Sequence, residues 1–417
     1  MNKILQSFRF ALRSIGSHKT RTVLSLIGVV IGVFSVVVVM TLGNGVKSFV
    51  LGQVESFGTD LIQVEVKIPN TGNMSNANAT SRAQGTQITT LTTDDKDAIE
   101  KLPNIVSAYT GTIGQERATY GSVGKRVLLF GASSEVTIVD RKAELAEGRF
   151  YTREEESSQA RVIVLGSGVK ETFFGSGTAV GESITIKGEK YRVVGVLASR
   201  GSAGFFDLDT LAYVPVTTLQ KKILGVNYVQ MISVRMEDVT REEETVADII
   251  GLLRKRHDIT TPDKDDFSVT STKQAQDTLG NVLGSLTILL LALTSISLVV
   301  GGVGIMNIMY VSVTERTSEI GLRKALGATS TNILYQFLFE SLIITLLGGV
   351  VGILLGIVVS LGLTQVFKNL GYAFALRFTW DTLLLGAGFS LLVGIVFGLS
   401  PAYRAAQLSP MEALRKE

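Results

Sequence analysis

The stretch GSVGK, residues 121–125, is the nearest that this chain comes to a phosphate-binding loop. A loop of that class needs the pattern G-x-x-x-x-G-K-[ST], whose backbone N–H groups surround the phosphates while the hydroxyl binds Mg²⁺. Here the two glycines are too close together, and Arg126 follows the lysine. We therefore expect no ATP site of this class in these 417 residues, and no cofactor bound by this chain.

Other catalytic patterns are missing as well. The sequence has no G-x-S-x-G and no H-E-x-x-H, and it contains no cysteine, which removes thiolate nucleophiles, thiolate metal sites and disulfides. The acidic runs at 154–156 and 242–244 are better explained as solvated surface than as cation sites. We predict a chain that is not an enzyme and has no metal site.

Two polar residues stand out inside apolar surroundings. Asn307 and Glu340 lie in or beside long uncharged runs, so they are the candidate intramembrane polar residues. Ionisable residues in spans are functional candidates by default, but a carboxylate near the interface can also hydrogen-bond to a neighbouring helix. A single carboxylate gives weak support to a proton-driven carrier, and a structural role for Glu340 is favoured.

The elements that position these residues follow from the charge pattern. Only 18% of residues are charged and mean hydropathy is +0.34, whereas soluble domains carry roughly 25% charged residues. Four uncharged runs exceed the ~20 residues that a membrane span needs. The chain is therefore predicted to be an α-helical membrane protein with four transmembrane helices. Its net charge of +3 gives no reason to expect a nucleic-acid partner.

The predicted segments, in chain order, are a cytoplasmic amphipathic interfacial helix (1–20), transmembrane helix 1 (21–44), an extracytoplasmic domain (45–277), transmembrane helix 2 (278–313), a cytoplasmic loop or helix (314–331), transmembrane helix 3 (332–367), an extracytoplasmic loop (368–381), transmembrane helix 4 (382–403) and a cytoplasmic tail (404–417). Residues 3–15 favour this interfacial helix, and the alternative is a soluble helix that packs against a partner. Apolar periodicity past residue 46 and a start near Lys273 predict that helices 1 and 2 continue beyond the bilayer.

Orientation follows from basic residues near the spans. The first 46 residues contain five basic side chains and no acidic one, which predicts a cytoplasmic N-terminus. Four spans then return the C-terminus to the cytoplasm. The outer segment, residues 45–277, has 27 basic and 31 acidic residues, a net charge of −4 (27 − 31).

The outer segment is predicted to be a large α+β domain with two subdomains, the second being a β-rich insertion at about residues 110–218. Residues 61–68 alternate as a strand, and residues 93–102 suit a helix with Thr92 as its cap and Asp95 at its third position. Residues 69–90 have almost no large apolar side chains and are predicted to be a mobile loop. Further predicted strands cover residues 126–130, 161–165, 183–186, 191–197, 211–215, 230–235 and 266–270, with a helix at 243–256.

Small residues recur in the predicted spans. Glycines four residues apart let helix backbones approach closely, although such spacings also arise by chance in glycine-rich spans. The candidate helix-packing residues are Gly28, Gly32, Gly301, Gly302, Gly304, Gly348, Gly352, Gly356, Gly394 and Gly398.

Several long phrases resemble one family. Residues 301–329, GGVGIMNIMYVSVTERTSEIGLRKALGAT, are followed by QFLFES, GGVVGILLG and a C-terminal PAYRAAQLSPMEALRKE. Together with residues 145–155, 174–197 and 207–220 they are similar to MacB/FtsX-like ABC-transporter permeases, and the layout of one span, a large outer domain and three spans is also similar.

The resemblance implies a dimeric permease, as a homodimer or heterodimer, in a bacterial inner membrane. It implies mechanotransmission, in which ATP hydrolysis by cytoplasmic ATPase subunits moves the outer domain, and it implies a MacA-like periplasmic adaptor. The fused ATPase domain of MacB does not precede span one here, so we expect a separate ABC ATPase that binds the ATP and Mg²⁺. The ATPase-coupling candidates are Glu315, Arg316, Glu319, Ile320, Arg323 and Lys324.

Three functions are compatible with the resemblance. The favoured one is efflux of peptides, antibiotics or other amphiphiles. The alternatives are lipoprotein release in the manner of LolC and LolE, and an FtsX-like regulator of cell-wall hydrolases that transports nothing. The phrases within residues 145–220 favour efflux over the regulator, whose outer domain is usually smaller.

Overall fold

The computed structural model describes residues 19–55, 58–69, 88–203, 206–369 and 378–414. The chain divides into two compact units. The helical unit comprises Met1–Phe49 and Gly280–Glu417, and the strand-rich unit comprises Val50–Leu279. The predicted interfacial helix at 3–15 and most of the predicted loop at 69–90 lie outside the described residues.

Four helices among the described residues are long and apolar enough to span a membrane. They are α2 (Lys19–Glu55), α10 (Thr272–Glu315), α12 (Ser330–Asn369) and α13 (Trp380–Gln407). Both α2 and α10 run past the uncharged runs, as the periodicity predicted, because charged residues outside the hydrocarbon do not interrupt a helix. The 44 residues of α10 correspond to about 66 Å at 1.5 Å per residue, roughly twice the hydrocarbon thickness.

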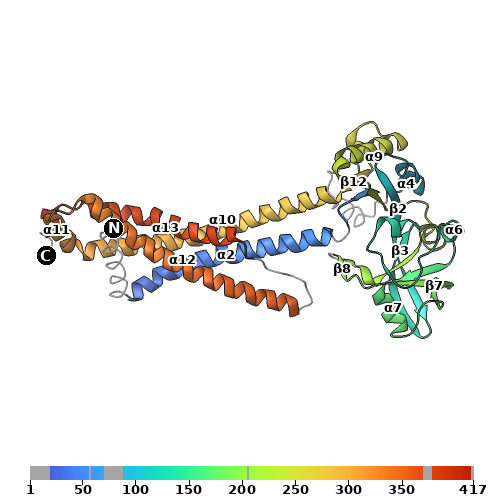
Figure 1. Cartoon of the computed structure of the whole chain (residues 1–417), viewed down its shortest axis with the longest axis horizontal. Helices are drawn as coiled ribbons and strands as arrows, with labels where there is room; N and C mark the ends of the chain where they lie inside the picture. The colour runs from blue at the N-terminus through green and yellow to red at the C-terminus, as the bar shows by residue number, and fades with distance from the viewer. Residues whose placement is uncertain (1–18, 56–57, 70–87, 204–205, 370–377, 415–417) are drawn as a thin grey trace. The chain divides into compact units, whose positions relative to one another are not determined.

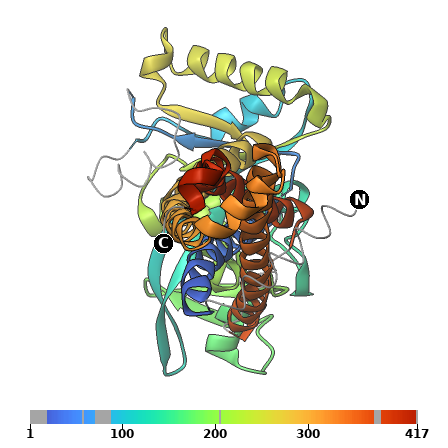
Figure 2. The same ribbon diagram turned by 90° about the vertical axis from the view of Figure 1, so that its left-hand side faces the viewer.

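The four long helices lie beside one another, as Figures 1 and 2 show from the side and from one end, and glycines lie at their contacts. A Cβ on Gly28 of α2 would lie 2.7 Å from the Cα of Gly301 of α10, so the two backbones touch there. Three glycines of α12 face α2: Cβ atoms on Gly348, Gly352 and Gly356 would lie within 3.1 Å of Val29, Val30 and Val37 respectively.

Helix α13 fits α12 and α10 in the same way. Cβ atoms on Gly394 and Gly398 would overlap Thr345 and Ser341 of α12, and one on Gly302 would overlap Phe397. The Leu298 side chain covers Gly32. Gly304 differs, because the structure places no atom within 4 Å of a Cβ built there. Its predicted packing role has no counterpart within the described part of this chain, since it faces away from the other helices.

The strand-rich unit is built on one ten-stranded sheet. The order along it is β12-β1-β11-β2-β3-β10-β5-β7-β4, and β6 pairs with β2 and β7. The strands are β1 (Leu61–Val66), β2 (Ile105–Tyr120), β3 (Val123–Ala132), β4 (Leu145–Gly148), β5 (Val162–Leu165), β6 (Ser183–Ile186), β7 (Glu189–Leu197), β10 (Leu211–Pro215), β11 (Met231–Met236) and β12 (Phe267–Ser271). A two-stranded ribbon joins β8 (Ser202–Ala203) to β9 (Phe206–Asp207).

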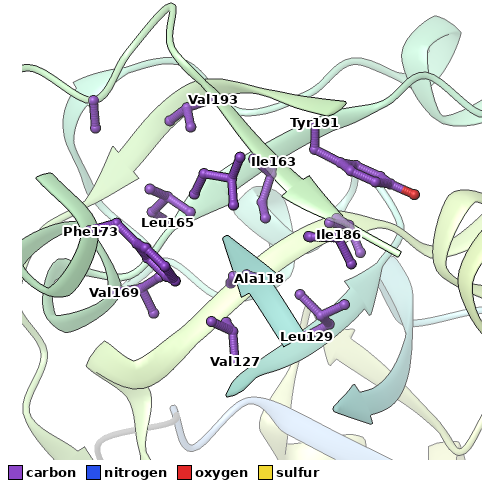
Figure 3. Packing of buried hydrophobic residues seen from close by; sticks show 14 of the residues in the cluster. Ala118, Val127, Leu129, Ile163, Leu165, Val169, Phe173, Ile186, Tyr191 and Val193 are labelled. Atoms are coloured by element: carbon purple, nitrogen blue, oxygen red, sulfur yellow. The ribbon is translucent and has the colours of Figure 1, made fainter. Parts of the chain in front are cut away.

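Helices connect and cover these strands. They are α4 (Thr93–Ile99), α5 (Val136–Val139), α6 (Arg153–Ser157), α7 (Ser167–Phe174), α8 (Val216–Thr218) and α9 (Glu242–Arg256). Asp95 accepts hydrogen bonds of 2.8 Å from both the N–H and the hydroxyl of Thr92, so α4 begins where the sequence predicted. One hydrophobic cluster gathers under β5, β7 and α7 around Leu129, Ile163 and Phe173 (Figure 3).

Strand β2 was absent from the predicted strands, although it is the longest in the sheet. Its buried face consists largely of small and polar residues, including Ala108, Thr110 and Thr112. Apolar alternation is therefore weak there, and pairing with β11, β3 and β6 holds the strand extended.

A buried lysine connects α4 to the loop before α5. The ammonium of Lys96 lies 3.0 Å from Asp97, 3.1 Å from Glu100 and 3.4 Å from Glu135, and its side chain is only 6% exposed. Burial alone would lower the pKa of Lys96, but these carboxylates outweigh burial and raise it. The charge is therefore retained where it is buried.

Candidate functional site

The coupling segment, residues 314–329, joins α10 to α12 and contains α11 (Thr317–Ala325). Glu319 occupies the first turn of α11, while Arg323 and Lys324 occupy the last. This arrangement suits the helix dipole, which favours acidic side chains at the N-terminus and basic ones at the C-terminus. Gly327, with φ of +96°, directly follows the C-cap residue of α11, Leu326, and ends that helix in a conformation that suits glycine. All the predicted coupling residues lie in this short stretch (Figure 1).

Arg316 contacts the intramembrane candidate Glu340. The guanidinium Nη1 of Arg316 lies 3.5 Å from Oε1 of Glu340 on α12, and the Glu340 side chain is only 6% exposed. A buried carboxylate needs a charged or hydrogen-bonding partner, because transfer of an isolated charge out of water is very costly. The two residues were predicted for different roles, and the structure brings them together.

Arg323 makes a second contact between α11 and α12. Its guanidinium donates to Oε1 of Gln336 at 2.7 Å and also pairs with Glu319 one turn earlier on α11. Gln336 lies one turn before Glu340, so both contacts fall on the same face of α12.

Lys324 fixes α11 to α13. Its ammonium donates to the carbonyl oxygens of Ala406 at 2.6 Å and Leu408 at 2.7 Å. Terminal carbonyls of a helix have no partner within the helix, and a cation there also complements the dipole. Lys324 therefore stabilises the end of α13 while holding the coupling segment against it.

The two faces of α11 differ in burial. Ile320 is only 1% exposed, so it packs inside the chain rather than outward, contrary to the prediction that it was available to a partner. Gly321 packs on Ala413 of α14 (Pro410–Leu414), where a Cβ would lie 2.6 Å from the alanine methyl group. A helix this short carries two apolar faces, and the sequence alone does not show which is covered.

The other face of α11 is apolar and exposed. Leu322 is 54% exposed and Leu326 is 81% exposed, and Met411 on the neighbouring α14 is 82% exposed. We call these three residues the docking face. Leu322 and Leu326 belong to the segment that the three contacts above hold against α12 and α13, and Met411 belongs to α14, which packs on that segment at Gly321.

Two remaining candidates are solvent- or lipid-facing. Glu315 is exposed at the end of α10, and Asn307 is exposed two turns earlier on the same helix. Among the described residues, no group of three or more His, Cys, Asp or Glu side chains could hold a metal ion.

Sequence reasoning missed Gln336 and the packing of α14. Gln336 gives no signal by type, and only its spacing from Glu340 points to it. The start of α14 was visible in the sequence, because Ser409 followed by Pro410 is a typical helix start, and Ser409 accepts a hydrogen bond from the N–H of Ala413 at 3.0 Å.

Two family models together match most of the chain. Residues 22–252 match the model described as MacB-like periplasmic core domain, and residues 291–410 match the model described as FtsX-like permease C-terminal. The chain belongs to the MacB/FtsX-like permease family. The predicted resemblance is confirmed, and so is the predicted fold class, in which a strand-rich domain is inserted between the first and second of four membrane helices.

Relatives of this MacB/FtsX-like permease align along its whole length. The macrolide export ATP-binding/permease protein MacB of Wolinella succinogenes is 36% identical, over 100% of this chain and 61% of that protein. The protein of the same name from Chlorobaculum tepidum is 38% identical, over 98% of this chain and 61% of that protein. The chain thus spans about three fifths of the length of these relatives.

Among solved structures, the periplasmic region of MacB from Actinobacillus actinomycetemcomitans is 21% identical, with a TM-score of 0.46. The matched residues cover 56% of this chain and 98% of the MacB periplasmic region. Within the MacB/FtsX-like permease described here, the coupling segment and Glu340 fall in the FtsX-like part, and Lys96 falls in the MacB-like part. The protein is a multi-pass membrane protein.

Proposed function

We propose that this chain is the permease of an ABC transporter, and that a separate ATPase polypeptide docks on the coupling segment. ATP hydrolysis there moves α11, and the membrane helices relay the movement to the strand-rich domain by mechanotransmission. The observation that carries the proposal is the exposed docking face, in which Leu322 and Leu326 lie on a segment that is tied to two helices and Met411 lies on the neighbouring α14.

The geometry of the segment supports coupling rather than simple connection. A plain connector needs no exposed apolar side chains, whereas apolar anchors beside charged groups are typical of protein interfaces. The contacts of Arg316, Arg323 and Lys324 prevent α11 from moving alone, so a force on it reaches α12 and α13.

ATP and Mg²⁺ are bound by the ATPase in this proposal, because these 417 residues contain no phosphate-binding loop. The basic residues near the spans support cytoplasmic termini and a cytoplasmic coupling segment, in a bacterial inner membrane. A MacA-like adaptor on the other side of the membrane remains part of the proposal.

The proposed cargo is a peptide, an antibiotic or another amphiphile. Support comes from the names of the relatives, which describe macrolide export. The match of residues 22–252 to a MacB-like periplasmic core favours efflux over a regulator of cell-wall hydrolases. Lipoprotein release is the second candidate function. Offering a lipoprotein and a small amphiphile as cargo to the same reconstituted system distinguishes lipoprotein release from efflux.

We also propose that two copies associate through α10. Exposed side chains recur along it at alternating four- and three-residue intervals, the period of a coiled-coil seam. The seam residues are Val282, Leu286, Leu289, Leu293, Ile296, Val300, Val303 and Asn307.

Two properties of this seam favour a second copy over lipid. The seam covers 26 residues, about 38 Å of helix, which exceeds the ~30 Å hydrocarbon core, so lipid tails cannot cover all of it. Asn307 occupies the position where a single polar residue sets the register of paired helices, and an amide facing lipid would otherwise lack partners.

The proposal is tested by removing the docking face without disturbing the fold. We expect Leu322→Asp with Leu326→Asp to abolish copurification of the ATPase, because charge replaces the apolar contact. Ile138→Asp, at a side chain 51% exposed in the strand-rich unit, is the matched control and should leave copurification unchanged. Normal copurification and normal ATPase modulation in the double variant would contradict the proposed docking site.

A further inference from the structure

The ion pair between Arg316 and Glu340 lies at a mechanical junction of the helical unit. Arg316 is the one residue between the end of α10 at Glu315 and the start of α11 at Thr317. Its backbone, with φ of −107° and ψ of 18°, departs from helix geometry, so the direction of the chain changes there. Its side chain reaches the buried Glu340 at 3.5 Å.

Glu340 and the next residue face two different neighbours. Ser341 is fully buried and donates a 2.9 Å hydrogen bond to the carbonyl oxygen of Gly394 on α13. A Cβ on Gly398 would also overlap Ser341, so α12 and α13 interlock at this level. Residues 340 and 341 therefore join the α10–α11 corner to α13 through α12.

The burial of Glu340 makes this contact persistent. Glu340 is only 6% exposed, and a charged group that is out of water is held beside its partners because separating them is costly, whereas exposed pairs contribute little. The nearby pair of Arg323 with Glu319 is of the second kind, since Glu319 is 50% exposed. Movement of the corner thus keeps Glu340 beside Arg316 and takes α12 with it.

We propose that Arg316 and Glu340 are positioning residues that keep α12 in step with the coupling segment during the ATP cycle. The inference rests on the proposed function and goes further, because it names the route by which movement leaves α11 for the rest of the bundle. Without the pair, Arg323 and Lys324 still tie α11 to α12 and α13, but the corner between α10 and α11 loses its own contact with α12, so less of the movement reaches α12. The pair neither binds ATP nor moves a proton.

The test uses the full chain with its ATPase in nanodiscs. The sequence has no cysteine, so spin labels at Ile288→Cys, which lies off the seam, and Val366→Cys, both exposed, report the distance between α10 and α12. We expect ATP to change this distance in the intact chain. Arg316→Glu and Glu340→Arg should each reduce the responding fraction by at least about fivefold, the lower end of usual coupling effects, while the ATPase still copurifies.

The charge exchange distinguishes positioning from a merely structural role. Arg316→Glu combined with Glu340→Arg restores opposite charges and should restore the distance change. If Arg316→Glu or Glu340→Arg does not fold, Glu340→Gln replaces it, because this substitution keeps the shape of the side chain. Glu340→Gln should show the same reduction in the fraction that responds to ATP. Asp381→Asn is the control and should respond normally, because Asp381 is an exposed carboxylate in the first turn of α13, outside the coupling segment.

Two failures are distinguishable. If the ATPase does not copurify with the intact chain, or ATP changes no distance in it, the proposed function fails. If the intact chain responds and the folded single variants respond equally, or the exchange does not restore the response, only the positioning role is overturned.

Discussion

Gly28 and Gly301 meet backbone to backbone: a Cβ on Gly28 would lie 2.7 Å from the Cα of Gly301, and a Cβ on Gly301 would lie 2.7 Å from the carbonyl carbon of Gly28. The same antiparallel pairing of α2 with α10 continues where Gly43 faces Thr287. The two helices therefore pack as a close pair over several turns, which suits the relay of movement along them.

Gly301→Val is expected to separate this pair. The added side chain has no room, and overpacking of this kind typically costs about 1–3 kcal/mol. Thermal unfolding in detergent measures the effect. Gly304→Val is the matched control, because the structure leaves open space around that glycine. Equal unfolding temperatures for the two variants would contradict the close contact.

Lys324→Met is expected to destabilise the end of α13. The substitution leaves the carbonyls of Ala406 and Leu408 without their charged donor, and hydrogen bonds to charged groups contribute about 1.5–3 kcal/mol. Thermal unfolding and protease sensitivity after residue 406 report the loss. Lys368→Met, at an exposed lysine of α12, should change neither quantity; an equal effect there would assign the loss to charge alone.

Lys96→Met is expected to weaken the strand-rich unit. It leaves Glu100 and Glu135 facing each other without the buried cation, at a cost of about 3 kcal/mol. Adding Glu135→Gln should recover part of the stability, because it removes one unpaired charge. The control is Lys101→Met at an exposed site. Limited proteolysis measures the loss of stability in the strand-rich unit. If Lys96→Met is as stable as the intact chain, the proposed stabilisation by the buried network is refuted.

Acid should destabilise the strand-rich unit below about pH 4, near the ordinary pKa values of carboxyl groups. Burial alone would raise the pKa of Asp95, but hydrogen bonds from Arg256 and Thr92 outweigh it and lower this pKa. The folded state then binds fewer protons than the unfolded state, so the stabilisation is present above the ordinary pKa and is lost as pH falls through the lowered one.

Arg256→Gln tests this pH dependence. The variant should be less stable at pH 6 and should lose less stability between pH 5 and pH 3, because Asp95 loses the 2.6 Å contact that lowers its pKa. Arg126→Gln, at an exposed position of β3, is the control. Circular dichroism during thermal unfolding gives the change of stability with pH for the intact chain and for both variants. The same pH dependence in all three would exclude the contact between Arg256 and Asp95 as its cause.

Disulfide formation between copies tests the α10 seam. Leu289→Cys lies on the seam and Ile288→Cys lies about 100° around the helix, with exposures of 57% and 69%. Only the first should give a cross-linked dimer under mild oxidation in membranes, because a disulfide needs Cα atoms within about 7 Å. Equal cross-linking, or none from residue 289, would contradict the seam.

The membrane spans could be predicted because charge and apolarity act locally along the chain. Pairings between distant residues could not. Arg316 and Glu340 are far apart in sequence, and their contact depends on how α11 folds back on α12. Ile320 and Gly304 are further examples. The sequence indicates that both residues could pack, but it does not show which face of a helix contacts another element. Strand β2 was missed because its buried residues are small and polar.

Site-specific photo-crosslinking from Leu326 tests the central claim most directly. A benzophenone amino acid placed at residue 326, in the full chain coexpressed with an ABC ATPase that copurifies with it, should give a covalent adduct with that ATPase. The same group at Ile138 should give none. An ATPase adduct from residue 138 but not from 326, in a chain that is folded and inserted, would contradict docking on the coupling segment.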